Sequence, residues 1–216
     1  MISIRKNYLL ITFIFIIILC FFIVFKAMSQ AKTLTENELK IVLALVAQGR
    51  HAARNRLMIL LSHWSGMRVG EIAALIFSDV INHHDIVYDE IRLTAEQTKG
   101  SQSRVVMVGE RLRKEIASYC KQLKKNVPSA PLIYSQKCRT GFTANSLSQE
   151  FKTIYQRAGI KGASSHSGRR TFITVLANKG IGVRVLQSLA GHRSIATTQV
   201  YIDVNDQMKR AAVNLI

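Results

Sequence analysis

Six residues spread from position 68 to position 201 could together cleave a phosphodiester bond. They are Arg68, Lys99, His166, Arg169, His192 and Tyr201. They lie in four short segments with the letters SGMRVGE, TKG, HSGRR and GHRSIATTQVY. One tyrosine, two arginines, two histidines and a lysine suit the attack of a tyrosine hydroxyl on a DNA phosphate.

A phosphodiester resists attack because its anionic oxygens repel nucleophiles and its leaving alkoxide is very basic. A catalyst without a metal must supply a nucleophile, neutralise charge on the pentacoordinate phosphorus and protonate the departing oxygen. Arg68 and Arg169 suit the second task, because a guanidinium is always charged and can donate to two phosphate oxygens. The two histidines could donate to the same oxygens or carry the tyrosine proton. Lys99 could reach the leaving oxygen, and Tyr201 would be the nucleophile, helped to ionise by neighbouring cations or a base.

Each of these residues also has an ordinary structural explanation. A single tyrosine near the end of a chain is usually a packing or surface residue. Arg68 could interact with a helix C-terminus, Lys99 could be a solvated turn residue, and His192 could begin a helix. His166 and Arg169, three positions apart, could form a surface pair. Their joint occurrence in this order is what favours the phosphodiester chemistry.

Mainly helical elements are expected to position these segments. Thr35 and Glu38 match a helix-opening capping box, and apolar residues follow at helical spacing. A second helix is predicted at about 51–65, ended by Gly66, and a short helix resumes near Val69.

The pattern changes to strands between residues 80 and 108. Apolar residues at 86–88, 91 and 93, and again at 105–108, flank a polar turn that carries Lys99. This predicts an antiparallel hairpin, followed by a Lys-rich helix ending near Lys125 and a loop bracketed by Pro128 and Pro131. The predicted fold class is mainly α with a small antiparallel β-sheet (α+β).

Three apolar stripes predict further helices in the C-terminal half. They are Leu147, Phe151, Ile154 and Tyr155, then Phe172, Val175 and Leu176, then Val185, Leu186 and Leu189. A last helix is predicted over residues 205–215, after Tyr201.

With these motifs in place, the chain resembles the catalytic domain of tyrosine recombinases, the phage integrase family. That family's pattern is Arg-x-x-Glu after a helix, a hairpin lysine, His-x-x-Arg, Leu-x-Gly-His and a tyrosine nine residues after the last histidine. Here the pattern reads Arg68 to Glu71, Lys99, His166 to Arg169, Leu189 to His192, and Tyr201. The resemblance runs from about residue 33 to the end and fills all six catalytic positions.

The resemblance implies strand cleavage and rejoining without a metal or other cofactor. The tyrosine attacks the scissile phosphate, forms a 3′-phosphotyrosyl link and frees a 5′-hydroxyl. A 5′-hydroxyl of the partner strand then attacks the link and rejoins the DNA. Arg68, Arg169 and His192 would stabilise the transition state, Lys99 would act as general acid, and His166 would assist proton transfer.

Further residues are expected to support this site. Glu71 is expected to buttress its helix or Arg68. Arg170, Arg193, Arg104 and Lys161 are candidate phosphate contacts.

The resemblance also implies partners. These are double-stranded DNA, a homo-tetramer on that DNA, and docking of the C-terminal segment of one protomer on its neighbour. Most members of the family carry a separate helical DNA-binding domain before the catalytic one, whereas here only about 30 residues precede the first predicted helix. We therefore expect a catalytic-domain-only recombinase, similar to those that invert short promoter segments, and an accessory DNA-bending or clamp protein is a candidate partner.

The composition agrees with a polyanionic partner. The 216 residues carry a formal net charge of +17, with 30 lysines and arginines scattered along the chain. Such a surplus favours binding to a phosphate backbone through release of counterions. The three cysteines, Cys20, Cys120 and Cys138, have neither metal-ligand nor disulfide spacing and are expected to be ordinary reduced thiols.

An apolar, uncharged run occupies residues 8–25, between Arg5, Lys6 and Lys26. Its 18 residues would span about 27 Å as a helix, close to the bilayer core, so it is a transmembrane candidate. An alternative is that Met28 is the true start and residues 1–27 are an upstream extension. The predicted division is an apolar N-terminal segment, 1–27, and a catalytic domain, 28–216. The expected location is the cytoplasm, with a membrane-anchored protein bearing a cytoplasmic catalytic domain as the alternative.

Other functions remain open at this stage. The chain could be an idle DNA-binding remnant or regulator, or a DNA relaxer similar to type IB topoisomerases. The sequence distinguishes neither the target DNA nor integration from excision or inversion within a mobile element.

Overall fold

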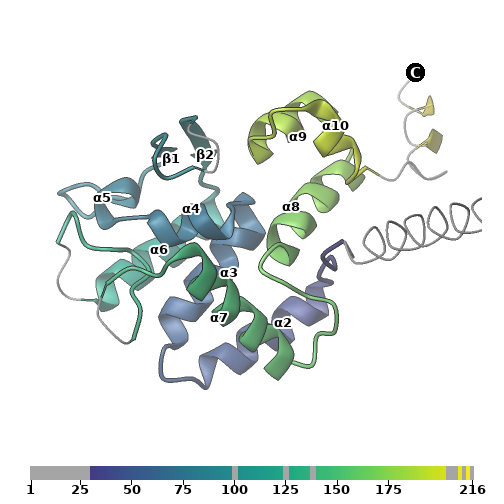
Figure 1. Cartoon of the computed structure of the whole chain (residues 1–216). Coiled ribbons are helices and arrows are strands. Elements are labelled where there is room, and N and C mark those ends of the chain that lie inside the picture. Colours follow the sequence, from purple (N-terminus) through teal and green to yellow (C-terminus); the bar gives the residue numbers. More distant parts are fainter. Residues whose placement is uncertain are drawn as a thin grey trace, which may run out of the picture. The chain divides into compact units, whose positions relative to one another are not determined.

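The helices and strands follow one another in a mainly α order, as expected. The computed structural model describes residues 30–98, 102–123, 127–136, 140–202, 209–210 and 213–214. Within these, the helices are α2 (Glu36–Ala47), α3 (Ala52–Ser65), α4 (Val69–Ala74), α5 (Phe77–Val80), α6 (Glu110–Gln122), α7 (Ala144–Arg157), α8 (Ser167–Asn178), α9 (Val183–Ala190) and α10 (Ile195–Gln199). The strands are β1 (Glu90–Leu93) and β2 (Arg104–Met107), which pair antiparallel (Figure 1).

The two predicted signals at the first helices are confirmed. The Glu38 N–H donates to the Thr35 hydroxyl at 3.2 Å, and the Thr35 N–H donates to Glu38 Oε2 at 3.0 Å. This capping box satisfies two backbone donors at the start of α2. At the other boundary, Gly66 ends α3 with a φ of 65°, a left-handed conformation that glycine adopts without steric cost.

Helix α3 is the centre of the hydrophobic core. Its five consecutive residues Leu57, Met58, Ile59, Leu60 and Leu61 are each at most 1% exposed. A helix buried all round loses the usual alternation of apolar and polar faces. Helices α2, α4, α6 and α8 all contact α3, and Figure 1 shows it in the middle of the fold.

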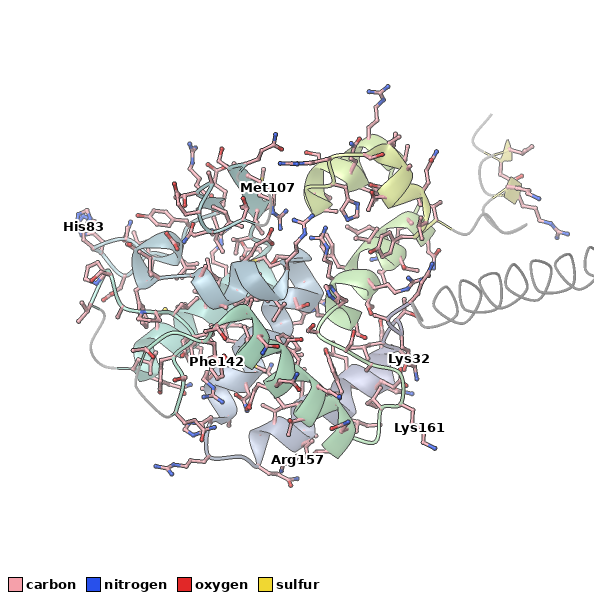
Figure 2. All side chains as sticks on the ribbon, in the orientation of Figure 1. Lys32, His83, Met107, Phe142, Arg157 and Lys161 are labelled. Carbon is pink, nitrogen blue, oxygen red and sulfur yellow. The ribbon has the colours of Figure 1, made fainter. Side chains whose placement is uncertain are left out.

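The strand prediction was wrong for residues 86–88. Ile86 and Tyr88 are 60% and 40% exposed, and the strand that pairs with β2 begins only at Glu90. This segment instead turns back toward residues 81 and 82. Asn82 Oδ1 accepts hydrogen bonds from the backbone N–H groups of His84 and Ile86, and Val87 forms an isolated antiparallel bridge with Ile81. One face of β2 also points to solvent, and Met107 on that face is 56% exposed at the surface of the hairpin (Figure 2).

The C-terminal stripes were predicted with mixed success. Leu147, Phe151, Ile154 and Tyr155 are all buried on α7, as expected. The second stripe was wrong, because Val175 is 44% exposed and α8 buries Ser167, Gly168, Arg169, Thr171, Ile173 and Ala177 instead. The third was wrong at Val185, which is 53% exposed, while Leu186 is buried. Helices α5 and α10 were not predicted, and the helix expected over 205–215 falls mostly outside the described residues.

Small residues at the α3–α8 contact explain the unexpected burial on α8. A Cβ on Gly168 would lie 2.7 Å from the Ser62 Oγ and 3.1 Å from the His63 backbone N. The absence of a side chain at position 168 therefore lets the two helices approach closely. This approach places the next residue, Arg169, against the C-terminal end of α3.

Two other expectations fall largely outside the described residues. The apolar run 8–25 is one, and no helix among the described residues is long and apolar enough to cross a membrane. Of the three cysteines, Cys20 and Cys138 lie outside the described residues, and Cys120 is a buried free thiol. Burial raises the pKa of the Cys120 thiol to about 11.

We predict that Gly168→Ala destabilises the protein by roughly 1–3 kcal/mol, because the added methyl group must push α8 away from α3. The midpoint of thermal unfolding should fall by several degrees. Gly70→Ala on α4 is the matched control, since its Cβ would meet Ala144 at an ordinary 3.6 Å and should leave the midpoint equal or higher. Equal midpoints for Gly168→Ala and the wild type would contradict this view of the α3–α8 contact.

Candidate active site

An open cleft of about 550 Å³ lies where the chain before α4, the hairpin and the end of α9 meet. Its lining is polar and cationic, and is formed by Arg68, Thr98, Gln102, Ser103, Arg104, Gly191, His192, Arg193, Ser194 and Thr197. Three segments that are far apart in sequence therefore line this cleft, and each contributes one arginine, namely Arg68, Arg104 and Arg193.

Three arginines converge on the C-terminal end of α9. Arg104 Nη1 donates to the Leu189 carbonyl at 3.0 Å, Arg169 Nη2 to the Ala190 carbonyl at 2.6 Å, and Arg68 Nη2 to the Gly191 carbonyl at 2.8 Å. The last carbonyls of a helix have no partner inside the helix and carry its negative partial charge. Each of these three successive carbonyls is satisfied here by a different guanidinium.

Glycines shape the turns that present these carbonyls. Gly191 has a φ of 61°, and a Cβ there would lie 2.6 Å from Arg104 Cδ. The Gly66 carbonyl at the end of α3 accepts Arg169 Nη1 at 2.6 Å, so one guanidinium joins two helix ends. The glycine of the Leu-x-Gly-His motif is thus required for both backbone conformation and space.

Glu71 is the counter-charge of the cluster. It is 1% exposed and accepts four hydrogen bonds: the backbone N–H and Nη1 of Arg68 at 2.7 and 2.9 Å, and Nε and Nη2 of Arg104 at 3.0 and 2.7 Å. Burial would raise the pKa of Glu71, but the hydrogen bonds and charges of Arg104 and Arg68 outweigh it and lower the pKa. Glu71 therefore remains a carboxylate, and it supports Arg68 as expected.

Arg169 is the most deeply placed cation, at 4% exposed. Burial lowers its pKa, and repulsion from Arg68 and Arg104 adds to the effect, to about 9. That value lies well above neutral pH, so Arg169 stays charged.

His192 and Tyr201 lie against each other. Their ring centroids are 5.7 Å apart with planes 21° from parallel, and the Arg170 guanidinium lies 5.2 Å from the centre of the tyrosine ring. Burial lowers the pKa of His192, and Arg169, Arg68 and Arg104 lower it further, to about 4. At neutral pH the imidazole is therefore uncharged and stacked on the tyrosine.

Four of the six predicted residues, Arg68, Arg169, His192 and Tyr201, come together. Of these four, Arg68 and His192 line the cleft, whereas Arg169 and Tyr201 lie next to them and are not among its lining residues. His166 occupies the exposed N-cap position of α8 and does not line the cleft either. Lys99 lies outside the described residues, although Thr98 and Gln102 on either side of it line the cleft.

The supporting cations take different positions. Arg104 and Arg193 line the cleft, and Arg170 lies over Tyr201. Lys161 is not among the residues that line the cleft. It lies beside Lys32 (Figure 2), and the backbone N–H of Lys32 donates to the carbonyl of Gly162, the residue after Lys161, at 3.1 Å.

Thr198 was missed by sequence reasoning. Its hydroxyl lies 2.9 Å from His192 Nδ1, and its carbonyl accepts the Tyr201 N–H at 3.0 Å. The sequence did hold one indication of this contact. Thr198 precedes Tyr201 by three residues, a spacing that allows the two to share one helical turn.

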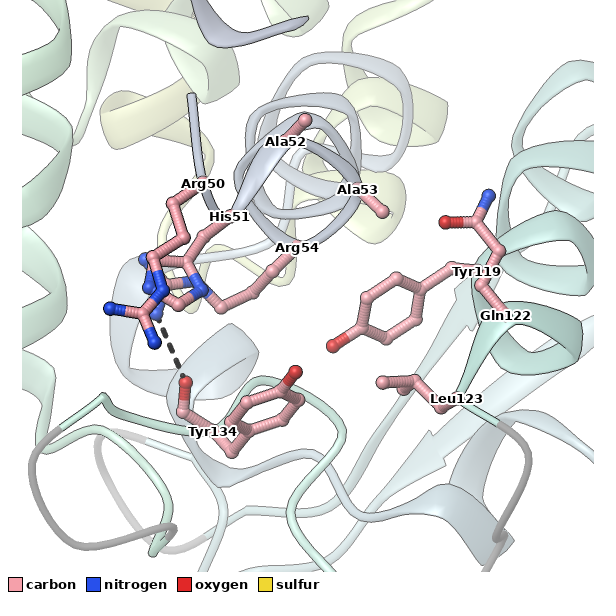
Figure 3. A pocket seen from close by; sticks show the side chains of 9 residues that line it. All are labelled: Arg50, His51, Ala52, Ala53, Arg54, Tyr119, Gln122, Leu123 and Tyr134. Carbon is pink, nitrogen blue, oxygen red and sulfur yellow. Dashed lines mark hydrogen bonds between the residues drawn. The ribbon is translucent and has the colours of Figure 1, made fainter. Parts of the chain in front are cut away.

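A second hollow, of about 290 Å³, lies at the N-terminal end of α3 (Figure 3). Arg54 in its wall is 2% exposed and donates to the Tyr134 carbonyl, to Asn55 and to Glu150. None of the predicted catalytic residues is among those that line it. Because these partners satisfy its charge, Arg54 serves to tie α3 to α7 and the loop at Tyr134.

Comparison with known proteins agrees with this geometry. Residues 32–208 match the model of the phage integrase family. The chain is 29% identical over 182 residues to the tyrosine recombinase XerA of Pyrococcus furiosus, which covers 84% of this chain and 60% of XerA. It therefore spans less than two thirds of the length of this curated relative.

Solved structures share the fold. A crystal structure of XerA recombinase superimposes with a TM-score of 0.68 at 26% identity, over 87% of this chain and 65% of that one. A XerH site-specific recombinase bound to palindromic difH substrate, in a post-cleavage complex, gives a TM-score of 0.63 at 22% identity, over 84% and 51%. The chain belongs to the phage integrase family, and its described part has the fold of tyrosine recombinase catalytic domains.

We predict that Glu71→Gln destabilises the protein by roughly 3 kcal/mol at neutral pH, because it leaves the partly buried Arg68 and Arg104 without their counter-charge. The folded-state pKa of Glu71 lies below its ordinary 4.5, so the stability that its charge contributes is present above that pH. It is lost as the pH falls through the folded-state value. Denaturant unfolding across pH should therefore show the variant and wild-type curves converging in acid.

The matched control for this measurement is Glu115→Gln. Glu115 pairs with Arg56 at the surface, so its loss should change stability by less than about 1 kcal/mol. A Glu71→Gln effect no larger than this control would contradict the role of Glu71 as the counter-charge.

Proposed function

We propose that this chain is a site-specific recombinase that breaks and rejoins DNA through a covalent 3′-phosphotyrosyl intermediate. The observation that carries the proposal is the stacking of Tyr201 on His192 beside the cluster of Arg68 and Arg169. A hydroxyl nucleophile next to fixed cations is the arrangement that attack on a phosphodiester requires.

In the first step, Tyr201 Oη attacks the phosphorus and passes its proton to His166, and the bond from phosphorus to the 5′-oxygen breaks. Arg68 and Arg169 neutralise the non-bridging oxygens, and the uncharged His192 donates a hydrogen bond to them. The proton for the leaving 5′-oxygen comes from Lys99, and His166 assists proton transfer. The partner strand's 5′-hydroxyl then reverses the step on the phosphotyrosyl link.

The fixed charges explain how such a step is accelerated. Arg68 and Arg169 each make two side-chain hydrogen bonds within the described residues, whereas a guanidinium carries five N–H donors. Donors therefore remain on both guanidinium groups, and Arg68 lines the cleft in which we place the phosphate. Since the protein contacts already hold the guanidinium planes, little reorganisation is needed when charge develops on the phosphate.

The partner in this proposal is double-stranded DNA. A net charge of +17 supports it, as does the DNA-bound state of the structural neighbour XerH. We further propose that residues 28–216 form the catalytic domain and act in the cytoplasm as a homo-tetramer on DNA. The segment after Tyr201 would dock on a neighbouring protomer. An accessory DNA-bending or clamp protein would supply further contacts to the duplex.

The test is the capture of protein covalently attached to DNA. The full chain is mixed with supercoiled plasmid carrying its own flanking genomic DNA and quenched with denaturant. We predict that Tyr201→Phe lowers attachment at least about a thousandfold, because it removes the nucleophile, while DNA binding is retained. Attachment that persists in this variant would refute the assignment.

Tyr88→Phe is the matched control. Tyr88 is 40% exposed and lines a different hollow, beside α5, with Phe77 and Pro128, so attachment should match the wild type. Wild-type protein that binds DNA but never forms an adduct would favour a DNA-binding regulator. Adducts that relax supercoils without exchanging strands would favour a topoisomerase-like relaxer.

A further inference from the structure

The hydroxyl of Thr198 has an unusual environment. Thr198 is fully buried, and its Oγ1 lies 2.9 Å from His192 Nδ1. Among the described residues, this nitrogen is the only hydrogen-bond partner of the hydroxyl. Thr171, on helix α8, behaves differently, because its hydroxyl donates to the Ser167 carbonyl four residues earlier at 2.8 Å.

The donor in this contact follows from satisfaction of buried groups. A buried hydroxyl proton without an acceptor costs much of its desolvation free energy. If His192 Nδ1 carried a proton, the Thr198 hydroxyl proton would have no acceptor among the described residues. The hydroxyl therefore donates and Nδ1 accepts. A neutral imidazole that accepts at Nδ1 carries its proton on Nε2.

We propose that Thr198 is a positioning residue that holds His192 as the Nε2–H tautomer, a neutral hydrogen-bond donor for the phosphate in the cleft. The phosphate in this statement rests on the proposed function, whereas the tautomer rests on the contact alone. The same residue also fixes the nucleophile segment, because its carbonyl accepts the Tyr201 N–H at 3.0 Å.

The charges around His192 agree with a neutral donor. Burial lowers the pKa of His192, and Arg169 from α8, Arg68 from the chain before α4 and Arg104 from β2 lower it further. A proton on both ring nitrogens would therefore add a cation to an already cationic cluster. A neutral ring can take either tautomer, so an outside group must select one. Thr198 is placed to make that selection.

The first test reads the tautomer directly. The full chain is labelled with ¹⁵N histidine, and NMR at neutral pH determines which ring nitrogen of His192 is protonated. The His192 signal is identified by its loss in His192→Gln. We expect the proton on Nε2 in the wild type and in Thr198→Ser, which keeps the hydroxyl. A proton on Nδ1 in the wild type would overturn the proposal.

The second test removes the hydroxyl at nearly constant volume. Thr198→Val should move His192 toward the Nδ1–H tautomer and slow covalent attachment to DNA about tenfold, the worth of one hydrogen bond. Thr198→Ser should restore both readouts. Thr174→Val is the control, because the buried Thr174 hydroxyl has no hydrogen-bond partner among the described residues to lose.

The outcomes separate this inference from the proposed function. An unchanged tautomer in Thr198→Val overturns the positioning role, even if attachment is slowed. Should Thr198→Val fail to fold, the wild-type and Thr198→Ser tautomers still decide the matter. Wild-type protein that forms no adduct counts against the proposed function, while the tautomer measurement keeps its meaning.

Discussion

The capture of the α9 C-terminus by three arginines is the interaction on which the candidate site depends. Leu189, Ala190 and Gly191 present successive carbonyls that lack helical donors, and Arg104, Arg169 and Arg68 each satisfy one of them. The guanidinium groups arrive from β2, from α8 and from the chain before α4. Because the next residue is His192, the position of the imidazole follows directly from that of the helix end. His192 in turn contacts Tyr201 through ring stacking and Thr198 through a hydrogen bond.

The same cluster solves an electrostatic problem. Three cations close together would repel one another, and two features offset this repulsion. Glu71 supplies a buried carboxylate shared by Arg68 and Arg104, and the negative end of α9 supplies partial charge. The balance leaves a net positive cleft, so a phosphate would complete the compensation. Burial and these arginines together lower the pKa of His192, so the imidazole is uncharged rather than another cation.

Sequence patterns predicted the local parts of this arrangement better than the long-range ones. The capping box at Thr35, the glycine stop after α3 and the apolar stripe of α7 depend on neighbours in sequence, and the structure confirms them. The apolar stripe expected on α8 was wrong, because that helix buries Gly168 and Arg169 against α3 and leaves Val175 exposed. The motifs identified the residue types of the site, but the pairing of Arg104 with Glu71 and the Thr198 contact depend on tertiary approach. No periodicity in the sequence encodes them.

We infer that the arginine contacts to the end of α9 hold the His192 and Tyr201 segment in place. Hydrogen exchange of backbone amides in Arg169→Lys tests it most directly, because lysine keeps the charge but cannot bridge the Gly66 and Ala190 carbonyls as a planar guanidinium does. We expect protection to fall at least about tenfold in α9 and α10, while α3 and α6 keep theirs. Unchanged protection in α9 and α10, or an equal fall throughout the domain, would contradict it.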